Sequence, residues 1–236
     1  MKNPIYKPKG AALEYCDLAV NIYDSCSHLC AYCYARDMAK RFSKPWGDTV
    51  SPRPGIVKAV RKQLAASDWK GREIMLCFTC DPYPVGCDTT VTREVIQAIK
   101  ESGNHVRILT KGDETAQRDF DLLDGNDWFG VTITETINQE EPHAAPESVR
   151  YRNIYTAKTN TKAKTWASCE PVLNPLAILA DIADYSAVDH WAIGKLNHRP
   201  SDIDWADFGR RAEELCQRLG RSYTIKNDLR KEMRQL

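Results

Sequence analysis

Short apolar runs alternate along this chain with segments in which apolar residues recur three and four positions apart. The runs are short and rich in β-branched and aromatic residues, which is typical of strands buried in a sheet. The predicted strands are Ala19–Tyr23, Ile74–Phe78, His105–Leu109, Phe129–Thr134, Lys164–Cys169, His190–Ile193 and Tyr223–Lys226.

The segments between these runs have the periodicity of amphipathic helices. The predicted helices are Ala31–Phe42, Ile56–Ala66, Thr92–Ser102, Ala116–Leu123, Pro146–Tyr155, Pro175–Tyr185 and Trp205–Leu219. Gly103 and Gly220 follow two of them, as expected for helix ends. Regular alternation of strands and helices predicts an α/β fold with a mostly parallel sheet.

Length and composition fit one globular domain over residues 1–236, with a polar leader at 1–14 and a basic, helical C-terminal segment at 205–236. Residues Glu140–Pro146 are expected to form a surface loop. Nine cysteines, an odd number, favour a reducing compartment. The sequence has no signal-peptide core and no run of about 18 apolar residues, so we expect a soluble, cytoplasmic protein without membrane partners.

The net charge of +1 gives no general argument for a polyanionic partner. Basic residues do gather near the C-terminus: Arg210, Arg211, Arg218, Arg221, Lys226, Arg230, Lys231 and Arg234. Such a cluster is compatible with nucleic-acid binding, although charges on an amphipathic helix usually only solvate it.

The most informative motif is C-x3-C-x2-C, formed by Cys26, Cys30 and Cys33. An iron–sulfur cube normally takes four thiolates, so three would leave one iron open for a reacting ligand. Two alternatives remain. His28, or Cys77 and Cys80, could complete a structural zinc site. Cys77, Cys80 and Cys87 could also hold a second cluster.

This motif, with Asn21-Ile-Tyr23-Asp-Ser before it and Tyr32 and Tyr34 around its last cysteine, resembles the radical S-adenosylmethionine (SAM) superfamily. The similarity is to the spore-photoproduct-lyase-like branch, also called DNA repair photolyases, and later segments resemble phage-associated radical SAM proteins. It implies a partial (β/α)6-type TIM-like barrel and a [4Fe–4S] cluster on Cys26, Cys30 and Cys33. It also implies reductive cleavage of SAM to a 5′-deoxyadenosyl radical and a low-potential electron donor of the flavodoxin or ferredoxin type.

Two further motifs follow predicted strands, where barrels place their reactive groups. Thr79-Cys80-Asp81-Pro82-Tyr83 resembles the "TDPY" element of that branch, and Leu109-Thr110-Lys111 its "LTK" element. The resemblance implies that Asp81 binds the SAM ammonium or ribose and that Lys111 pairs with the SAM carboxylate. The alternative for Asp81 is an Asp-Pro turn. The full set of predicted cofactor-binding residues is Tyr32, Thr79, Cys80, Asp81, Lys111, Thr132 and Thr134.

The later strand ends predict a substrate side of the barrel, formed by Glu170, Lys195, Asn197 and His198. Photoproduct lyases use a cysteine as hydrogen-atom donor, and Phe78 stands at the corresponding position. Cys80, Cys87 or Cys169 could take its place, and Cys80 and Cys169 are the candidate catalytic cysteines. The first functional hypothesis is a radical SAM enzyme acting on a nucleic acid or nucleotide. The others are a radical SAM enzyme acting on a peptide or small metabolite, and a non-catalytic metal-binding module.

Overall fold

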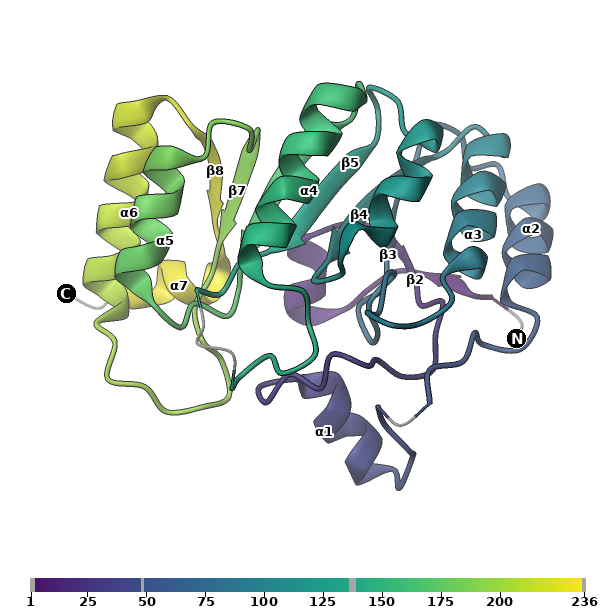
Figure 1. The fold of residues 1–236 in the computed structure, drawn as a ribbon, viewed down its shortest axis with the longest axis horizontal. Helices are drawn as coiled ribbons and strands as arrows, with labels where there is room; N and C mark the ends of the chain where they lie inside the picture. Colours follow the sequence, from purple (N-terminus) through teal and green to yellow (C-terminus); the bar gives the residue numbers. More distant parts are fainter. Residues whose placement is uncertain (1–2, 48, 136–138, 235–236) are drawn as a thin grey trace.

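The fold is built on one eight-stranded sheet whose strands follow each other in chain order (Figure 1). The computed structural model describes residues 3–47, 49–135 and 139–234. The strands are β1 (Ile5–Tyr6), β2 (Leu18–Val20), β3 (Glu73–Leu76), β4 (His105–Thr110), β5 (Trp128–Thr132), β6 (Lys164–Cys169), β7 (His190–Ile193) and β8 (Ser222–Ile225). β1 pairs antiparallel with β2, and β2 to β8 are parallel. Within the described residues β1 and β8 do not pair, so the barrel is open.

Helical segments connect the successive parallel strands. The α-helices are α1 (Tyr34–Arg41), α2 (Ile56–Ala66), α3 (Thr90–Glu101), α4 (Glu147–Asn160), α5 (Pro175–Asp184), α6 (Trp205–Leu219) and α7 (Asn227–Glu232), and the 3-10 helices are η1 (Gly10–Glu14) and η2 (Glu114–Leu122). Figure 1 shows α2 to α6 standing beside the sheet, whereas α1 projects from its lower edge. None of the helices in the described ranges is both long and apolar enough to cross a bilayer.

The predicted α/β class and partial parallel barrel are confirmed. The parallel strands are β2 to β8, one more than the six of a (β/α)6 barrel. Predicted strands and helices occur where the apolar pattern placed them, with ends that differ by a few residues. The pattern gave no separate prediction for η1, β1 or α7, although α7 lies within the C-terminal segment that was expected to be helical. In the polar leader, β1 has two residues and is fixed by Gln63, which accepts from the Ile5 N–H at 2.8 Å and donates to the Ile5 carbonyl at 2.8 Å. Ala116–Leu123, predicted as an α-helix, lies largely within the 3-10 helix η2.

Aromatic residues and Arg107 pack inside the barrel near the amino ends of its strands. The Arg107 guanidinium lies 4.6 Å from the Trp166 ring centroid and 5.0 Å from that of Trp128. On β5, a Cβ added to Gly130 would stand 2.3 Å from the Trp166 ring, so this position accepts only glycine unless the ring moves. These residues fill the interior toward the start of the strands, and open space remains at the other end.

Candidate functional site

A cavity of about 490 Å³ opens at the carboxyl ends of the parallel strands. Nearly all of the residues predicted to bind cluster or cofactor line it: Cys26, Cys30, Cys33, Tyr32, Thr79, Cys80, Asp81, Lys111 and Thr132. Its volume is within the range of about 300–1,000 Å³ typical of sites for small molecules.

The loop that carries the three cysteines is fixed to other segments of the chain. Its Ser25 Oγ accepts from the Gly47 N–H at 2.7 Å, and its Ser27 Oγ donates to the Val85 carbonyl at 2.8 Å. Leu29 has a positive φ of 53°. Its side chain packs against Gly47, where an added Cβ would lie 2.2 Å from Leu29 Cδ2. A left-handed φ is uncommon for leucine, and it turns the loop back on itself between Cys26 and Cys30.

His28, which could complete a zinc site with the three cysteines, has partners on both ring nitrogens. Its Nε2 accepts from the Val85 N–H at 3.1 Å, and its Nδ1 lies 3.6 Å from Asp81 Oδ2. Burial lowers its pKa. The three thiols line the cavity together, and their role as cluster ligands stays a prediction.

Asp81 makes the hydrogen bonds of an Asx turn, the alternative that the sequence left open. Its Oδ1 accepts from the Tyr83 N–H at 2.8 Å and from the Thr110 hydroxyl, and its Oδ2 accepts from the Lys111 N–H at 2.9 Å. The carboxylate therefore ties the loop after β3 to the end of β4. Since it also lines the cavity, a further contact with a ligand stays a prediction.

Lys111 brings a positive charge into the cavity. Its side chain is half-buried, and its Nζ lies 5.5 Å from the centroid of the Tyr32 ring. Burial lowers the pKa of this ammonium, but the charges of Cys30 and Glu141 outweigh burial and raise it. Within the described part of the chain the ammonium has no hydrogen-bond or ion-pair partner, so it is available to an anionic group of a ligand.

Tyr32 is held by a buried ion pair that the sequence did not predict. Glu141 accepts hydrogen bonds from the Tyr32 hydroxyl and from Arg150. Arg150 also donates to the carbonyls of Ala145 at 2.8 Å and Thr132 at 3.0 Å. The prediction of a surface loop at Glu140–Pro146 is thus wrong in part, because Glu141 is 5% exposed and Ala145 is 3% exposed. Burial raises the pKa of Glu141, and the charges of Lys111 and Arg150 outweigh it and lower the pKa.

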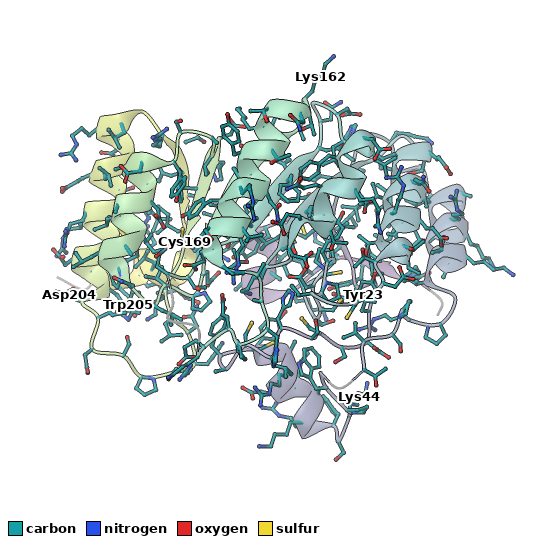
Figure 2. The ribbon with its side chains drawn as sticks, in the orientation of Figure 1. Tyr23, Lys44, Lys162, Cys169, Asp204 and Trp205 are labelled. Atoms are coloured by element: carbon teal, nitrogen blue, oxygen red, sulfur yellow. The ribbon has the colours of Figure 1, made fainter. Side chains whose placement is uncertain are left out.

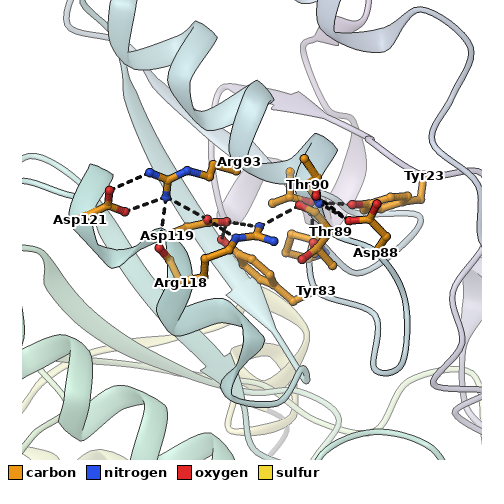
Figure 3. Close-up of polar contacts among 11 residues, drawn as sticks. Tyr23, Tyr83, Asp88, Thr89, Thr90, Arg93, Arg118, Asp119 and Asp121 are labelled. Carbon is orange, nitrogen blue, oxygen red and sulfur yellow. Dashed lines mark hydrogen bonds and ion pairs between the residues drawn. The ribbon is translucent and has the colours of Figure 1, made fainter.

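Behind the cavity, a polar network fastens the loop that contains Thr79, Cys80 and Asp81 (Figure 3). The Tyr83 hydroxyl donates to Asp119 Oδ2 at 3.1 Å, and Asp119 is fully buried. Arg118 and Arg93 contact the same carboxylate at 2.8 and 3.2 Å. Because both guanidiniums compensate the buried charge, the loop has a rigid attachment to α3 and η2.

The opposite wall of the cavity is formed by the later strands. Glu170 and Asn197, predicted on the substrate side, line the cavity and are linked by a hydrogen bond of 3.0 Å. Glu170 also pairs with Lys226 at 2.7 Å and accepts from the Tyr15 hydroxyl at 2.8 Å. Tyr15 was not predicted, because its segment precedes the first predicted strand and has no recognisable motif.

Three candidate residues lie outside this cavity. Thr134 is buried beyond the end of β5, and its hydroxyl donates to Glu147 at 3.0 Å, which does not support the predicted contact with SAM. Cys169 is buried in the core between sheet and helices, so the prediction that it is catalytic is not supported either. Its neighbours Ser168 and Glu170 contact Tyr15 inside the barrel, and alternation turns Cys169 away. Cys87 is separate from Cys77 and Cys80, which both line the cavity.

Four of the eight basic residues of the C-terminal segment form ion pairs within the protein. Lys226 is 3% exposed, and Arg230, Lys231 and Arg211 pair with Glu213, Asp228 and Asp207. These pairs neutralise much of the charge that suggested nucleic-acid binding.

Comparisons with known proteins identify a family and a fold. The family model described as "Protein of unknown function (DUF5131)" matches residues 10–228. The uncharacterized protein ORF301 of Acidianus two-tailed virus is 25% identical over 209 residues, which cover 78% of this chain and 68% of that protein. The uncharacterized protein MJ0683 of Methanocaldococcus jannaschii is 30% identical over 142 residues, 59% of this chain and 50% of that protein.

Solved structures with a similar fold include a spore photoproduct lyase variant with bound SAM and dinucleoside spore photoproduct. It is 17% identical, with a TM-score of 0.59 over 88% of this chain and 63% of the lyase. SuiB of Streptococcus suis, bound to SAM, is 9% identical with a TM-score of 0.63 over 92% of this chain and 52% of SuiB. The chain thus spans between half and two thirds of these two proteins. Both have the radical SAM fold, which confirms the fold predicted from the cysteine motif.

Proposed function

Because this chain belongs to the DUF5131 family of proteins of unknown function and has the radical SAM fold, we propose that it is a radical SAM enzyme. The observation that carries the proposal is that Cys26, Cys30 and Cys33 line the same cavity as Lys111, whose ammonium has no partner among residues 3–47, 49–135 and 139–234. Three thiolates would hold a [4Fe–4S] cluster and leave one iron for another ligand.

When bound, the reduced cluster would supply the electron that cleaves SAM to methionine and a 5′-deoxyadenosyl radical, which abstracts hydrogen from the substrate. Lys111 would pair with the SAM carboxylate, since a charge-assisted hydrogen bond satisfies both groups. Asp81 fixes the backbone that carries Lys111, and Glu141 fixes Tyr32 against the same part of the cavity. Thr79, Cys80 and Thr132 line it and supply hydroxyl and thiol groups.

For the substrate, the wall that contains Glu170, Asn197 and Lys226 supports a small molecule with several hydrogen-bonding groups. Carboxylate and amide side chains can recognise the edges of a base, and a nucleotide or short oligonucleotide is our first hypothesis. The same wall suits a peptide or small metabolite as the second hypothesis. A long duplex is less favoured, because four of the eight basic residues of the C-terminal segment are paired with acidic residues of the protein.

The test is anaerobic reconstitution with iron and sulfide, followed by reduction with dithionite in the presence of SAM. We expect broad visible absorption that bleaches on reduction, and formation of methionine and 5′-deoxyadenosine measured by mass spectrometry. Mononucleotides, dinucleotides and short peptides are then compared as substrates. A reduced cluster that never cleaves SAM contradicts the proposal, and stoichiometric zinc without iron supports a structural metal module.

A further inference from the structure

Helix α1 starts directly after Cys33 and exposes most of its side chains. Ala35 and Ala39 are its buried residues. In Figure 1 the helix projects from the lower edge of the barrel, and in Figure 2 Lys44 is labelled just beyond its end, on the same projecting part. A helix that buries only two alanines presents an unusually large share of its surface to solvent.

An exposed apolar row runs along one face of α1 and continues to Phe42, the residue after the helix. Tyr34, Met38 and Phe42 are spaced four residues apart, so they align on one side of the helix. Their exposed fractions are 51%, 39% and 67%. Single exposed apolar residues are ordinary, but an aligned row of three beside a functional cavity is typical of a surface that binds a protein.

The rest of the exposed surface is strongly basic. Residues 34–44 contain Arg36, Lys40, Arg41 and Lys44 against the single acidic residue Asp37, a net charge of +3, whereas the whole chain has +1. All four basic side chains are exposed. Within the described ranges Lys40, Arg41 and Lys44 have no ion-pair partner. The charge of this short segment is therefore available to a partner of opposite sign.

This surface is continuous with the candidate site. A groove of about 480 Å³ along α1 is lined by Ala31, Arg36, Asp37, Lys40, Lys44 and Trp46. Trp46 and the first residue of the apolar row, Tyr34, also line the cavity that contains the cysteines. The Tyr34 hydroxyl donates to the Phe78 carbonyl at 2.6 Å, which fixes the start of the helix to the end of β3. A partner bound to α1 would thus contact Tyr34 and Trp46, which line the same cavity as the cysteine loop.

We propose that this α1 surface, meaning the row Tyr34, Met38 and Phe42 with Arg36, Lys40, Arg41 and Lys44, docks a small acidic electron-carrier protein. The inference rests on the proposed function, which needs one electron delivered to the cluster. In each encounter the carrier is oxidised by one electron and the cluster is reduced by one, with no bond made or broken. A small apolar centre with a basic rim suits such a partner, because electron-transfer complexes are small, weak and steered by charge.

A nucleic acid is the other occupant that a basic surface could attract. Eight helical residues extend over only about 12 Å, which offers a short contact for a phosphate backbone. The surface also begins at Tyr34, directly after Cys33 of the cysteine loop. Its position therefore favours a partner of the cluster over a substrate.

The experiment compares two charge reversals that change the net charge equally. K40E/K44E alters the α1 surface, and K58E/K62E alters two exposed lysines with the same spacing on α2. Binding of oxidised flavodoxin to each reconstituted protein is measured by calorimetry at low and at physiological ionic strength. We expect K40E/K44E to weaken binding by at least about tenfold, with a smaller salt dependence, and K58E/K62E to remain within about twofold of the original chain. Phe42→Ser should weaken binding by about tenfold as well, because it removes the apolar centre.

A kinetic measurement complements binding. Reduction of the cluster by reduced flavodoxin, followed by bleaching of its visible absorption, should slow in K40E/K44E, while reduction by dithionite stays unchanged. The proposal is overturned if the original chain does not bind flavodoxin, or if both double variants lose flavodoxin affinity equally. It is also overturned if K40E/K44E loses only oligonucleotide binding. If dithionite reduces the cluster and SAM is never cleaved, the proposed function fails, yet the binding comparison still decides whether α1 is the docking surface.

Discussion

Lys111 and Lys226 lie on opposite walls of the cavity and have opposite surroundings. Lys111, after β4, is half-buried, and within the described residues its ammonium has no partner. Lys226, after β8, is 3% exposed, lies 2.7 Å from Glu170, and stands 3.5 Å from the centroid of the Tyr15 ring. Among the described residues, the Lys111 ammonium thus lacks a protein partner, whereas the Lys226 ammonium is paired with Glu170.

The two lysines therefore have different roles: Lys226 contributes to stability, and Lys111 is available for ligand binding. A buried pair such as Lys226 and Glu170 is costly to break, because removing one member leaves a charge without compensation. An unpaired cation beside three thiols contributes little to folding, but it can bind an anionic ligand strongly. We therefore expect the loss of Lys111 to weaken SAM binding with little effect on stability, and the loss of the Lys226–Glu170 pair to lower stability.

The largest effect is expected from Cys30→Ala on the cysteine wall. Loss of one of three thiolate ligands should reduce iron from about four per reconstituted chain to background. Iron analysis and electron paramagnetic resonance measure this. Cys87→Ala is the matched control, since Cys87 is half-buried and does not line the cavity. Equal iron content in both variants would show that Cys30 is not a cluster ligand, and the cysteine wall would lose its proposed role.

Lys226→Met should cost about 3 kcal/mol of unfolding free energy, because it leaves the Glu170 carboxylate without its buried partner. Urea denaturation measures the change. In the double variant Lys226→Met/Glu170→Gln, part of the loss should be regained, since the unpaired charge is then absent. Strictly additive losses would mean that the two residues are not coupled and that this wall is not held together by its ion pair.

Lys111→Met tests the other lysine. SAM affinity should fall by about 10–100-fold, the value of one charge-assisted hydrogen bond, while unfolding free energy changes by less than about 1 kcal/mol. Equilibrium binding of SAM to reconstituted protein, with iron content as control, gives the first quantity. If the variant binds SAM normally but has a much lower free energy of unfolding, Lys111 stabilises the fold as Lys226 does. The proposed difference between the two lysines would then be wrong.

Much of the Lys111 wall could be predicted from the sequence, because its signals are local. Strand periodicity located β3 and β4, and the rule that reactive groups follow barrel strands brought Lys111 and the cysteine loop into one cavity. The opposite wall depends on contacts across the chain. Tyr15 and Glu170 are 155 residues apart, and no local pattern connects them.

The remaining errors have similar causes. Glu141 stands in a polar, proline-containing segment that resembles a surface loop, and only its pairing with Arg150 makes burial possible. β1 and α7 are too short to show a period. Cys169 is different, because Glu170 was already assigned to the cavity, and strand alternation alone would have turned Cys169 away from it.

The smallest expected effect comes from a partly exposed ion pair between α6 and α7. On α7, Arg230 donates to Glu213 on α6 at 2.7 Å, and this hydrogen bond lowers the pKa of Glu213. Glu213→Gln should cost only about 0.5 kcal/mol at neutral pH, because solvent screens the pair. The contrast with Lys226→Met shows how far burial, and not pairing alone, determines the cost.

The sign of the pH dependence makes this last prediction specific. A carboxylate whose pKa is lowered by folding contributes its stability above the unfolded-state pKa of about 4.3, and loses it as pH falls through the folded-state value. The unfolding curves of Glu213→Gln and the original chain should therefore differ at pH 7 and converge in acid. Other carboxylates titrate in both proteins, so they cancel in the difference. A difference that persists after Glu213 is protonated would assign the loss to packing around Tyr223, whose hydroxyl donates to Glu213 at 3.2 Å, and not to charge.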